Sequence, residues 1–385
     1  MKNKYSFSSL YFEVTRSCNL SCPMCMTGCN DAGFVEKKER AELTHEEIVE
    51  KVLKPARYDL GISQVGFSGG EFLLREDALE LAHEATKLGY KVGINTNGTL
   101  VTEDMLDGLK KAAGNNLVMT FGINSILPGR AHSKTRDEAL QTTLDAMALC
   151  DRLKITKHAI VTVGQFNKEE LEETLNWLEK NHIPYNRSPF AKRNAGRDFY
   201  RKYGLNRKDM QEFIHPALRK HANGYVSYTP FFLSPELHTQ ISGGKHYNVT
   251  VPQNPSIGCW CGTWIAVNAE GDVAPCAILL DELDAGNVRE TPLFRIVDES
   301  PIFQDILDRN RLKGRCGRCR YKITCGGCRA LAWYETGDYM AEDPSCFFDP
   351  SDESEISPHE EETNRNFQRY AKYAVWSGML IPPED

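Results

Sequence analysis

The sequence Cys-Asn-Leu-Ser-Cys-Pro-Met-Cys at residues 18–25 places three cysteines within eight residues, with the spacing C-x3-C-x2-C. The predominantly apolar run at residues 10–14, directly before it, predicts a β-strand. Thiolates on a loop just after a strand are typical ligands of an iron–sulfur cluster. Three thiolates would hold three irons of a four-iron cluster and leave the fourth iron open to another ligand. A zinc site is the alternative, because Cys29 would supply the fourth ligand that zinc usually needs.

Composition restricts the class of protein. The chain has 385 residues, of which 41% are hydrophobic, and this is enough for two domains with cores of their own. The net charge of −7 argues against a general binder of nucleic acids or membrane surfaces. No apolar run has transmembrane length, and the N-terminus lacks the apolar stretch of a signal peptide. Thirteen cysteines without a secretion signal therefore indicate metal binding in a reducing cytoplasm rather than a disulfide scaffold.

Strand-like and helical segments alternate from about residue 8 to residue 215. The predicted strands are residues 11–14, 65–67, 91–95, 117–121, 159–163 and 183–185. The predicted helices begin with a capping box at residues 44–47 and continue at residues 76–88, 102–112, 135–149 and 167–179. Six such β/α units predict an α/β fold, a partial TIM-like (β/α)6 barrel with a parallel sheet. We expect its chemistry at the carboxyl ends of the strands, where the cysteine loop falls.

A second set of cysteines occupies the C-terminal part of the chain. Cys259 and Cys261 precede a predicted β-hairpin that turns at Glu-Gly-Asp, residues 270–272, and ends at Cys276. The cysteines that follow are Cys316, Cys319, Cys325, Cys328 and Cys346. These eight cysteines make two sets of four, which suit two iron–sulfur clusters and two zinc ions equally well.

The loop at residues 18–25, together with Gly69-Gly70-Glu71 after the second predicted strand, resembles the signature of the radical S-adenosylmethionine (SAM) enzymes. The resemblance implies that Cys18, Cys22 and Cys25 hold a four-iron cluster whose open iron is chelated by SAM. It further implies reductive cleavage of SAM to methionine and a 5′-deoxyadenosyl radical that abstracts a hydrogen atom. The positions that the resemblance places near SAM are Met24, Gly69, Gly70, Glu71, Asn97, Asn124 and Arg136, with the Glu71 carboxylate accepting from the SAM amino group. Asn124 stands where the family often has Asp, and Arg136 is expected to open a helix.

The predicted hairpin and its cysteines resemble the SPASM domain of radical SAM enzymes, which carries two auxiliary iron–sulfur clusters. The resemblance implies three four-iron clusters in all, with auxiliary ligands among Cys259, Cys261, Cys276, Cys316, Cys319, Cys325, Cys328 and Cys346. The four-cysteine run departs from the family pattern, because it ends C-x2-C where C-x3-C is common. The predicted organisation is a barrel at residues 8–220, a connecting segment at 221–254, a SPASM domain at 255–348 and a tail at 349–385.

The region from Cys328 to Cys346 is most similar to the maturases of pyrroloquinoline quinone and mycofactocin and to enzymes of the alternative heme pathway. We expect a maturase that acts on a peptide or protein, and the alternative is a modifier of a small molecule or of porphyrin side chains. An iron–sulfur electron-transfer protein is the alternative from another class. Expected partners are an electron donor such as flavodoxin or ferredoxin and a separate peptide carrier protein, because few residues precede the cysteine loop. Ala277 stands where the sulfatase-maturing branch has Asp, which argues against that branch.

A basic run follows the sixth predicted strand, at residues 187–197. Its cations are Arg187, Lys192, Arg193 and Arg197. Their position at the reactive face of a barrel leads to the hypothesis that some of them bind a carboxylate of SAM or of an acidic substrate. A solvated basic loop is the alternative.

Overall fold

The computed structural model describes residues 7, 9–29, 40–136, 139–189, 192–194, 196–221, 259, 261, 264–319, 322, 325–346 and 350. Nearly all of the predicted connecting segment at 221–254 and of the tail at 349–385 lies outside the described residues. Within the described helices, none is long and apolar enough to cross a membrane.

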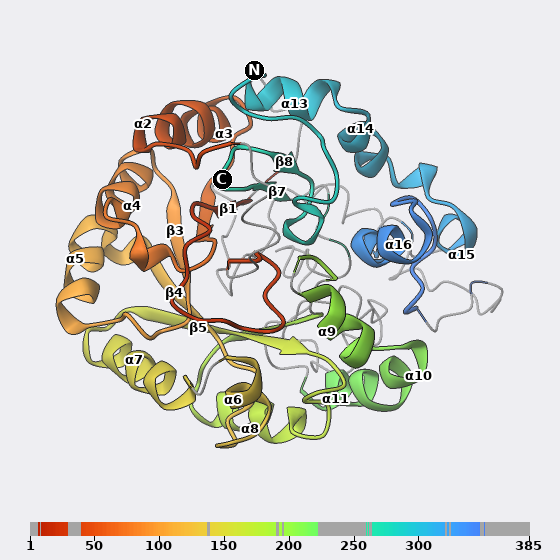
Figure 1. The fold of residues 1–385 in the computed structure, drawn as a ribbon, viewed down its shortest axis with the longest axis horizontal. Helices are drawn as coiled ribbons and strands as arrows, with labels where there is room; N and C mark the ends of the chain where they lie inside the picture. The colour runs from red at the N-terminus through yellow and green to blue at the C-terminus, as the bar shows by residue number, and fades with distance from the viewer. Residues whose placement is uncertain are drawn as a thin grey trace, which may run out of the picture.

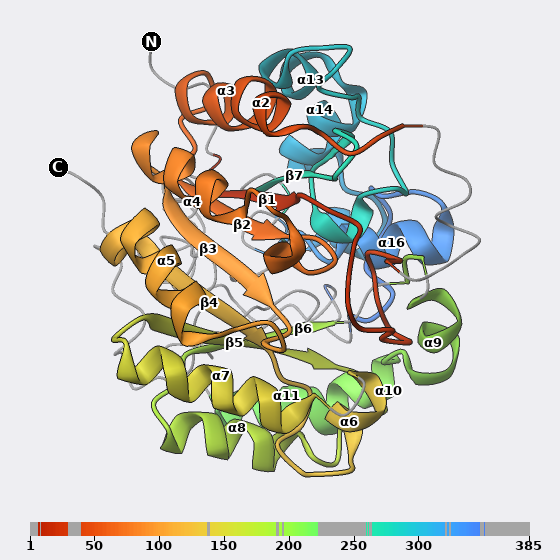
Figure 2. The same ribbon diagram turned by 60° about the vertical axis from the view of Figure 1, so that its left-hand side comes forward.

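A curved eight-stranded sheet forms the centre of the molecule (Figures 1 and 2). Its strands are β1 (Ser9–Glu13), β2 (Gln64–Ser68), β3 (Lys91–Thr96), β4 (Leu117–Gly122), β5 (Thr156–Val163), β6 (Tyr185–Pro189), β7 (Trp264–Val267) and β8 (Val273–Ala274). The spatial order is β6-β5-β4-β3-β2-β1-β7-β8. Every pairing from β1 to β6 is parallel, so the carboxyl ends of these strands share one edge. The predicted partial (β/α)6 barrel is therefore confirmed.

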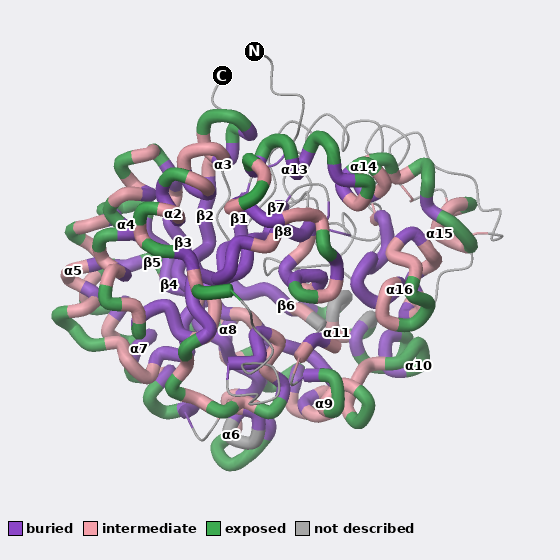
Figure 3. The backbone as a smooth tube through the Cα atoms, turned by 45° about the horizontal axis from the view of Figure 1, so that its top comes forward, coloured by how far each residue is buried: buried purple, intermediate pink, exposed green. Residues whose placement is uncertain are grey.

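Helices surround the outer face of this curved sheet, and the helices of the C-terminal part lie beside it (Figure 1). Around the barrel lie α2 (His45–Glu47), α3 (Lys54–Tyr58), α4 (Ala78–Lys87), α5 (Glu103–Ala113), α6 (Ala131–Thr135), α7 (Leu140–Arg152), α8 (Leu171–Lys180), α9 (Gly196–Tyr203), α10 (Arg207–Asp209) and α11 (His215–Lys220). The C-terminal part contributes α13 (Leu293–Glu299), α14 (Pro301–Leu307), α15 (Gly314–Arg318) and α16 (Arg329–Thr336). The strands are buried, and exposed residues concentrate on the outer sides of the helices (Figure 3). This is the pattern of amphipathic helices packed on a two-sided parallel sheet.

Local signals in the sequence locate several helix ends correctly. The Thr44 hydroxyl accepts from the backbone of Glu47 while the Glu47 carboxylate accepts from the Thr44 N–H, which is the predicted capping box. Thr102 caps α5 in the same way, by accepting from the Met105 N–H. Cys150 lies in α7 and is fully buried.

Two of the predicted boundaries that differ from the structure bear on the site. The predicted helix at 135–149 is two helices, α6 and α7, and Arg136 ends the first of them instead of opening the second. The sixth strand begins at Tyr185, two residues later than predicted, and runs through Asn186 and Ser188. The basic run at residues 187–197 is expected to follow this strand, but Arg187 and Ser188 belong to it, and the side chains of Asn186 and Ser188 line the pocket inside the barrel.

The C-terminal hairpin is joined directly to the barrel. The predicted hairpin is confirmed as β7 and β8, which pair antiparallel. Strand β7 also pairs parallel with β1, with Ser9 opposite Trp264 and Phe12 opposite Val267. This pairing holds the hairpin, and the cysteines next to it, against the first strand of the barrel.

Candidate active site

A pocket of about 300 Å³ opens at the carboxyl ends of the barrel strands. Most residues that the sequence singles out line it: Cys18, Cys22, Met24, Cys25, Gly69, Gly70, Asn97, Arg136, Cys259, Cys261, Cys276 and Cys328. The barrel contributes one wall and the C-terminal domain contributes the other. Glu71, Asn124, Cys316, Cys319, Cys325 and Cys346 are not part of the lining of this pocket.

The thiols of the loop after β1 lie close together. Cys29 contacts Cys25, with their sulfurs 3.9 Å apart, and also hydrogen-bonds with Cys18. The Cys29 thiol and backbone N–H groups of residues 27–29 lower the pKa of Cys25 to about 5, although burial opposes this shift. Thiolate is the form of cysteine that binds metal. Cys29, interpreted from the sequence as a loop thiol or a spare ligand, is part of this thiol group.

Gly69 and Gly70 allow the loop after β2 to contact the backbone that leads into Cys18. The Gly70 N–H donates to the Thr15 carbonyl and the Glu71 N–H donates to the Ser17 carbonyl, both at 2.8 Å. A Cβ on Gly70 would lie 2.0 Å from the Ser17 carbonyl oxygen, so no other residue fits without moving the backbone. Gly69 has φ of +130° in addition, a conformation that L side chains rarely adopt.

The Glu71 carboxylate is directed into the protein. It is fully buried, and it accepts hydrogen bonds from the Asn97 N–H at 2.8 Å, the Thr96 hydroxyl at 2.9 Å and the Leu73 N–H at 3.2 Å. Burial raises the pKa of Glu71, although these donors oppose the shift. These contacts tie the loop after β2 to the end of β3 and differ from the predicted contact with a SAM amino group.

The remaining predicted residues divide between the pocket and the interior. The Asn97 amide donates to Asn19 Oδ1 at 3.0 Å and lies on the pocket wall. Asn124 is fully buried, and its amide group donates to the Thr135 hydroxyl at 2.7 Å and contacts the Met24 sulfur at 3.4 Å. Arg136 lines the pocket, and its Nε has no hydrogen-bond partner among the described residues.

The C-terminal cysteines form two groups in space. Cys261 is close to both Cys259 and Cys276, and burial raises the pKa of Cys328, with nearby Asp343, Cys259 and Cys276 adding to the shift. Burial also raises the pKa of Cys325, but there the nearby cysteines that add to the shift are Cys346 and Cys316. The two cysteines of the run Cys325-Gly-Gly-Cys328 thus have different cysteines as their nearest charged neighbours, although the Cys259 N–H donates to the Cys325 carbonyl at 2.6 Å.

Arg329 lies between these two groups of cysteines. It lines the pocket, contacts the Cys316 sulfur at 3.8 Å and donates to the carbonyls of Tyr339 and Ala341. Burial opposes its charge, but the thiolates of Cys259 and Cys316 raise the pKa of Arg329 overall. Sequence reasoning missed this residue, although its place directly after Cys328 was a usable signal.

The basic run contacts carboxylates of the protein itself. Lys192 pairs with Glu335, Arg193 with Glu13 and Asp281, and Arg197 with Glu282. Arg187 is buried and donates to the His221 carbonyl at 3.4 Å. None of the four lines the pocket, so the structure does not support the hypothesis that they bind a carboxylate of SAM or substrate.

The inner wall of the barrel supplies polar side chains that the sequence analysis did not select. The pocket-lining members are Ser68, Asn95, Thr120, Thr162, Asn186 and Ser188, accompanied by the aromatic rings of Tyr11 and Trp264. Asn95 Oδ1 and Thr120 Oγ1 are buried without a hydrogen-bond partner in the described part of the chain. Polar residues at alternate positions of otherwise apolar parallel strands were the signal that would have identified them.

The pocket meets the chemical needs of the group that the sequence predicts. Thiols suit an iron–sulfur cluster, and the unpartnered polar atoms of Asn95, Thr120 and Arg136 would bind the polar groups of SAM or of a substrate.

Comparison with known proteins agrees with this geometry. The model of the radical SAM superfamily matches residues 12–178, and the model of the SPASM iron–sulfur cluster-binding domain matches residues 259–320. Among solved structures, anSMEcpe with bound AdoMet aligns with a TM-score of 0.64 at 18% identity, covering 95% of this chain and 96% of that one. SuiB of Streptococcus suis bound to its precursor peptide SuiA aligns with a TM-score of 0.64 at 16% identity, covering 89% and 76%. At these identities the two structures show a shared fold.

The sequence relatives include a heme synthase and a peptide cyclase. The AdoMet-dependent heme synthase of Methanosarcina barkeri is 28% identical over 353 residues, covering 88% of this chain and 96% of the relative. The PqqA peptide cyclase of Gluconobacter oxydans is 25% identical over 353 residues, covering 89% and 91%. The iron–sulfur and SAM-binding interpretation therefore replaces the zinc and electron-transfer alternatives. The chain belongs to the radical SAM superfamily, as an enzyme with a C-terminal SPASM iron–sulfur domain.

Proposed function

We propose that Cys18, Cys22 and Cys25 ligate a four-iron cluster and that SAM binds its open iron inside the pocket. The observation that carries this proposal is that the three thiols line one pocket together with Gly69 and Gly70. When bound and reduced, the cluster and SAM supply the hydrogen-abstracting radical of the family. Arg136 and Asn97 lie on the same wall and would bind polar groups of SAM. Glu71 would act indirectly, by holding the end of β3 against the glycine loop.

We infer two auxiliary clusters, which makes three in all. One would be ligated by Cys259, Cys261, Cys276 and Cys328, in agreement with the hydrogen bonds and electrostatic coupling among their thiols. The other would be ligated by Cys316, Cys325 and Cys346, completed by Cys319 at the end of α15. Four thiolates are the usual ligand set of such a cluster.

We propose a peptide or protein as the substrate, bound between the barrel mouth and the SPASM cysteines. The inner wall offers uncharged donors and acceptors, such as Asn95, Thr120 and Asn186, which suit amide groups. Within the basic run, Lys192, Arg193 and Arg197 pair with protein carboxylates and are not available for a polyanionic substrate. A flavodoxin or ferredoxin would supply the electron, and a separate carrier protein would deliver the peptide.

A porphyrin precursor of heme is the second candidate. It is favoured by the similarity to the heme synthase over nearly the whole chain. The wall formed by Tyr11, Trp264 and Ile278 would pack against a flat ring, and Arg136 and Arg329 would bind its carboxylates.

The test is deuterium transfer in the anaerobically reconstituted, reduced protein. Candidate peptides and porphyrins are supplied with deuterium on their side-chain carbons, and 5′-deoxyadenosine is analysed by mass spectrometry. Deuterium from a peptide alone supports the first proposal, and deuterium from a porphyrin alone supports the second. A protein that loads iron and binds SAM but forms no 5′-deoxyadenosine would overturn both.

A further inference from the structure

The barrel and the C-terminal domain meet at a group of buried ion pairs beside the pocket. We call this group the Arg16–Arg193 network, and its members are Glu13, Arg16, Arg193, Glu270 and Asp281. Glu13 ends β1, and Arg16 is two residues before Cys18. Glu270 lies in the β7–β8 turn, and Asp281 follows Cys276 by five residues.

Arg193 connects the two domains from the centre of the network. Its side chain is fully buried and forms a forked pair with Glu13, with both N–O distances at 2.9 Å. It also binds Asp281, and it donates to the Ala277 carbonyl at 2.9 Å. Ala277 directly follows Cys276, so the guanidinium holds the backbone beside a cysteine of the SPASM domain.

Arg16 and Asn194 hold the other cysteine loop in the same way. Arg16 pairs with Asp281 at 2.8 Å and donates to the Thr27 carbonyl at 2.9 Å. The Asn194 amide donates to the Met26 carbonyl at 2.8 Å and to Asp281 at 3.2 Å. Met26 and Thr27 directly follow Cys25, and both line the pocket.

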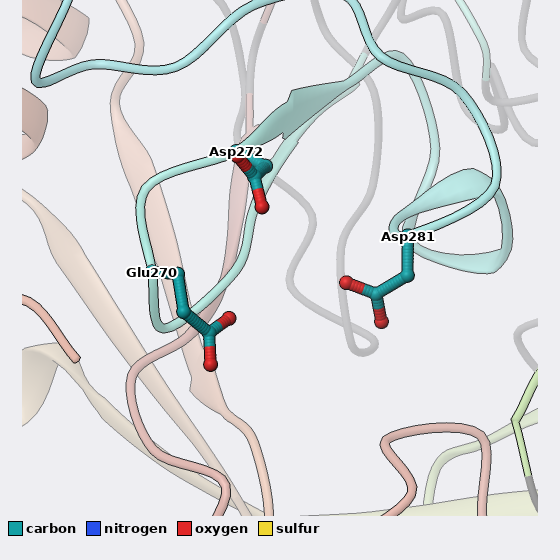
Figure 4. Close-up of side chains that lie close together, drawn as sticks. All are labelled: Glu270, Asp272 and Asp281. Atoms are coloured by element: carbon teal, nitrogen blue, oxygen red, sulfur yellow. The ribbon is translucent and has the colours of Figure 1, made fainter. Parts of the chain in front are cut away.

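The acidic side of the network has the form of a cation site, because Glu270, Asp272 and Asp281 offer oxygens within 4.8 Å of one another (Figure 4). Arginine side chains, however, supply the positive charge that balances these carboxylates. Arg16 binds both Glu270 and Asp281, and Asp272 pairs with Arg40 at 3.1 Å. The three carboxylates therefore connect the C-terminal domain to the barrel through ion pairs with Arg16 and Arg40.

We propose that Arg16, Arg193 and Asn194 are positioning residues that fix the SAM-cluster loop relative to the first SPASM cysteine group. Through Asp281 they connect the carbonyls after Cys25 to the carbonyl after Cys276. The spacing of the two cluster sites across the substrate pocket is thereby set by side chains outside both motifs. That the two loops hold iron–sulfur clusters rests on the proposed function, but the coupling between the two loops does not.

The test compares amide hydrogen exchange in residues 18–29 and 276–283 of the full-length chain, as purified and after reconstitution. Arg193→Met removes the charge, Arg193→Lys keeps the charge without the fork, and Asn194→Gly removes the amide. Glycine is suited to position 194 because φ there is +50°. Arg197→Met is the matched control, because it removes an exposed ion pair at the same domain junction, with Glu282.

We expect Arg193→Met to speed exchange at least tenfold in both segments, with Arg193→Lys intermediate. Asn194→Gly should speed exchange in residues 18–29, and Arg197→Met should leave both segments unchanged. In the reconstituted protein, Arg193→Met should also alter the change that SAM causes in the electron paramagnetic resonance signal of the reduced cluster.

Unchanged exchange in both segments of Arg193→Met, or the same increase throughout the chain, would overturn the proposal. If Arg193→Met does not fold, Asn194→Gly decides, and normal exchange in residues 18–29 of that variant would overturn it. Coupled exchange in a chain that cleaves no SAM would leave this inference standing and refute the proposed function.

Discussion

The two cysteine-bearing regions of this enzyme are built in different ways. Cys18, Cys22 and Cys25 lie within eight consecutive residues on a single loop. The SPASM groups collect cysteines from distant segments, and Cys276 and Cys328 are more than fifty residues apart in sequence. A local group can be recognised from its spacing, because the loop itself brings the ligands together. A dispersed group depends on the packing of the whole domain, and its membership follows from tertiary contacts.

The largest effect is expected from removing the local group. Replacing Cys18, Cys22 and Cys25 with Ala should remove about four of about twelve irons per chain and abolish SAM cleavage, because each four-iron cluster needs its thiolates. Iron content and 5′-deoxyadenosine formation measure the two effects. Cys150→Ala is the control, since Cys150 is buried in the barrel core. A wild-type chain with only about four irons would contradict the assignment of two auxiliary clusters.

Single substitutions of Cys325 and Cys328 test the proposed assignment of these two cysteines to different auxiliary clusters. Cys328→Ala should perturb the cluster assigned to Cys259, Cys261 and Cys276, and Cys325→Ala should perturb the other one, each with the loss of up to about four irons. Mössbauer or paramagnetic resonance spectra should therefore lose different signals in the two variants. Loss of the same signal in both would show that the two cysteines share a cluster.

The support of the local group is tested at Gly70. Gly70→Ala would place a Cβ 2.0 Å from the Ser17 carbonyl oxygen, next to Cys18. The displaced backbone should cost about 1–3 kcal/mol of stability and reduce iron loading of the SAM cluster. Gly108→Ala in α5 is the control, because its Cβ would meet only the end of the Leu79 side chain, at 3.2 Å, and its φ is not positive. Unchanged unfolding by urea and a full SAM-cluster signal would argue against this explanation of the glycine pair.

A substitution at Glu71 distinguishes two roles of its carboxylate, a contact with SAM and a contact within the protein. Glu71→Gln keeps the shape but replaces one acceptor oxygen with an amide donor, which faces donors such as the Asn97 N–H. The expected loss is about 1–3 kcal/mol in the free energy of unfolding without SAM, the cost of unsatisfied buried donors. SAM affinity measured by calorimetry should fall less than this. A large loss of SAM affinity with unchanged stability would restore the direct contact with the SAM amino group.

The smallest expected effect is a change in the pH dependence of stability, caused by a histidine in the barrel sheet. Burial lowers the pKa of His158 on β5 to about 3, so the folded state keeps this histidine neutral. Below its ordinary pKa the unfolded chain takes up a proton that the folded chain does not, so stability is present above that pKa and is lost as the pH falls. His158→Gln should reduce the stability lost between pH 6.5 and 5.5 by about 1 kcal/mol. Urea unfolding of the variant and the wild type at the two pH values measures this difference. The same loss of unfolding free energy in both proteins would contradict the prediction.

Patterns between neighbouring residues were sufficient for much of the fold and for the first site. The capping box at Thr44 and Glu47, the alternation of strands and helices, and the cysteine loop at 18–25 depend on contacts over a few residues, which a sequence displays directly. The hairpin from β7 to β8 was predicted for the same reason. Its addition to β1 was not, because that pairing joins residues about 255 positions apart.

Tertiary packing decided the partners of charged and polar groups. The sequence placed Arg193 and Glu71 near the reactive end of the barrel, but both side chains are buried against protein partners from other segments. A buried guanidinium or carboxylate must be paired wherever the fold supplies a partner, and a sequence does not show which segment that will be. For the same reason, the spacing of Cys325 and Cys328 does not say whether they share a cluster, although only two residues lie between them.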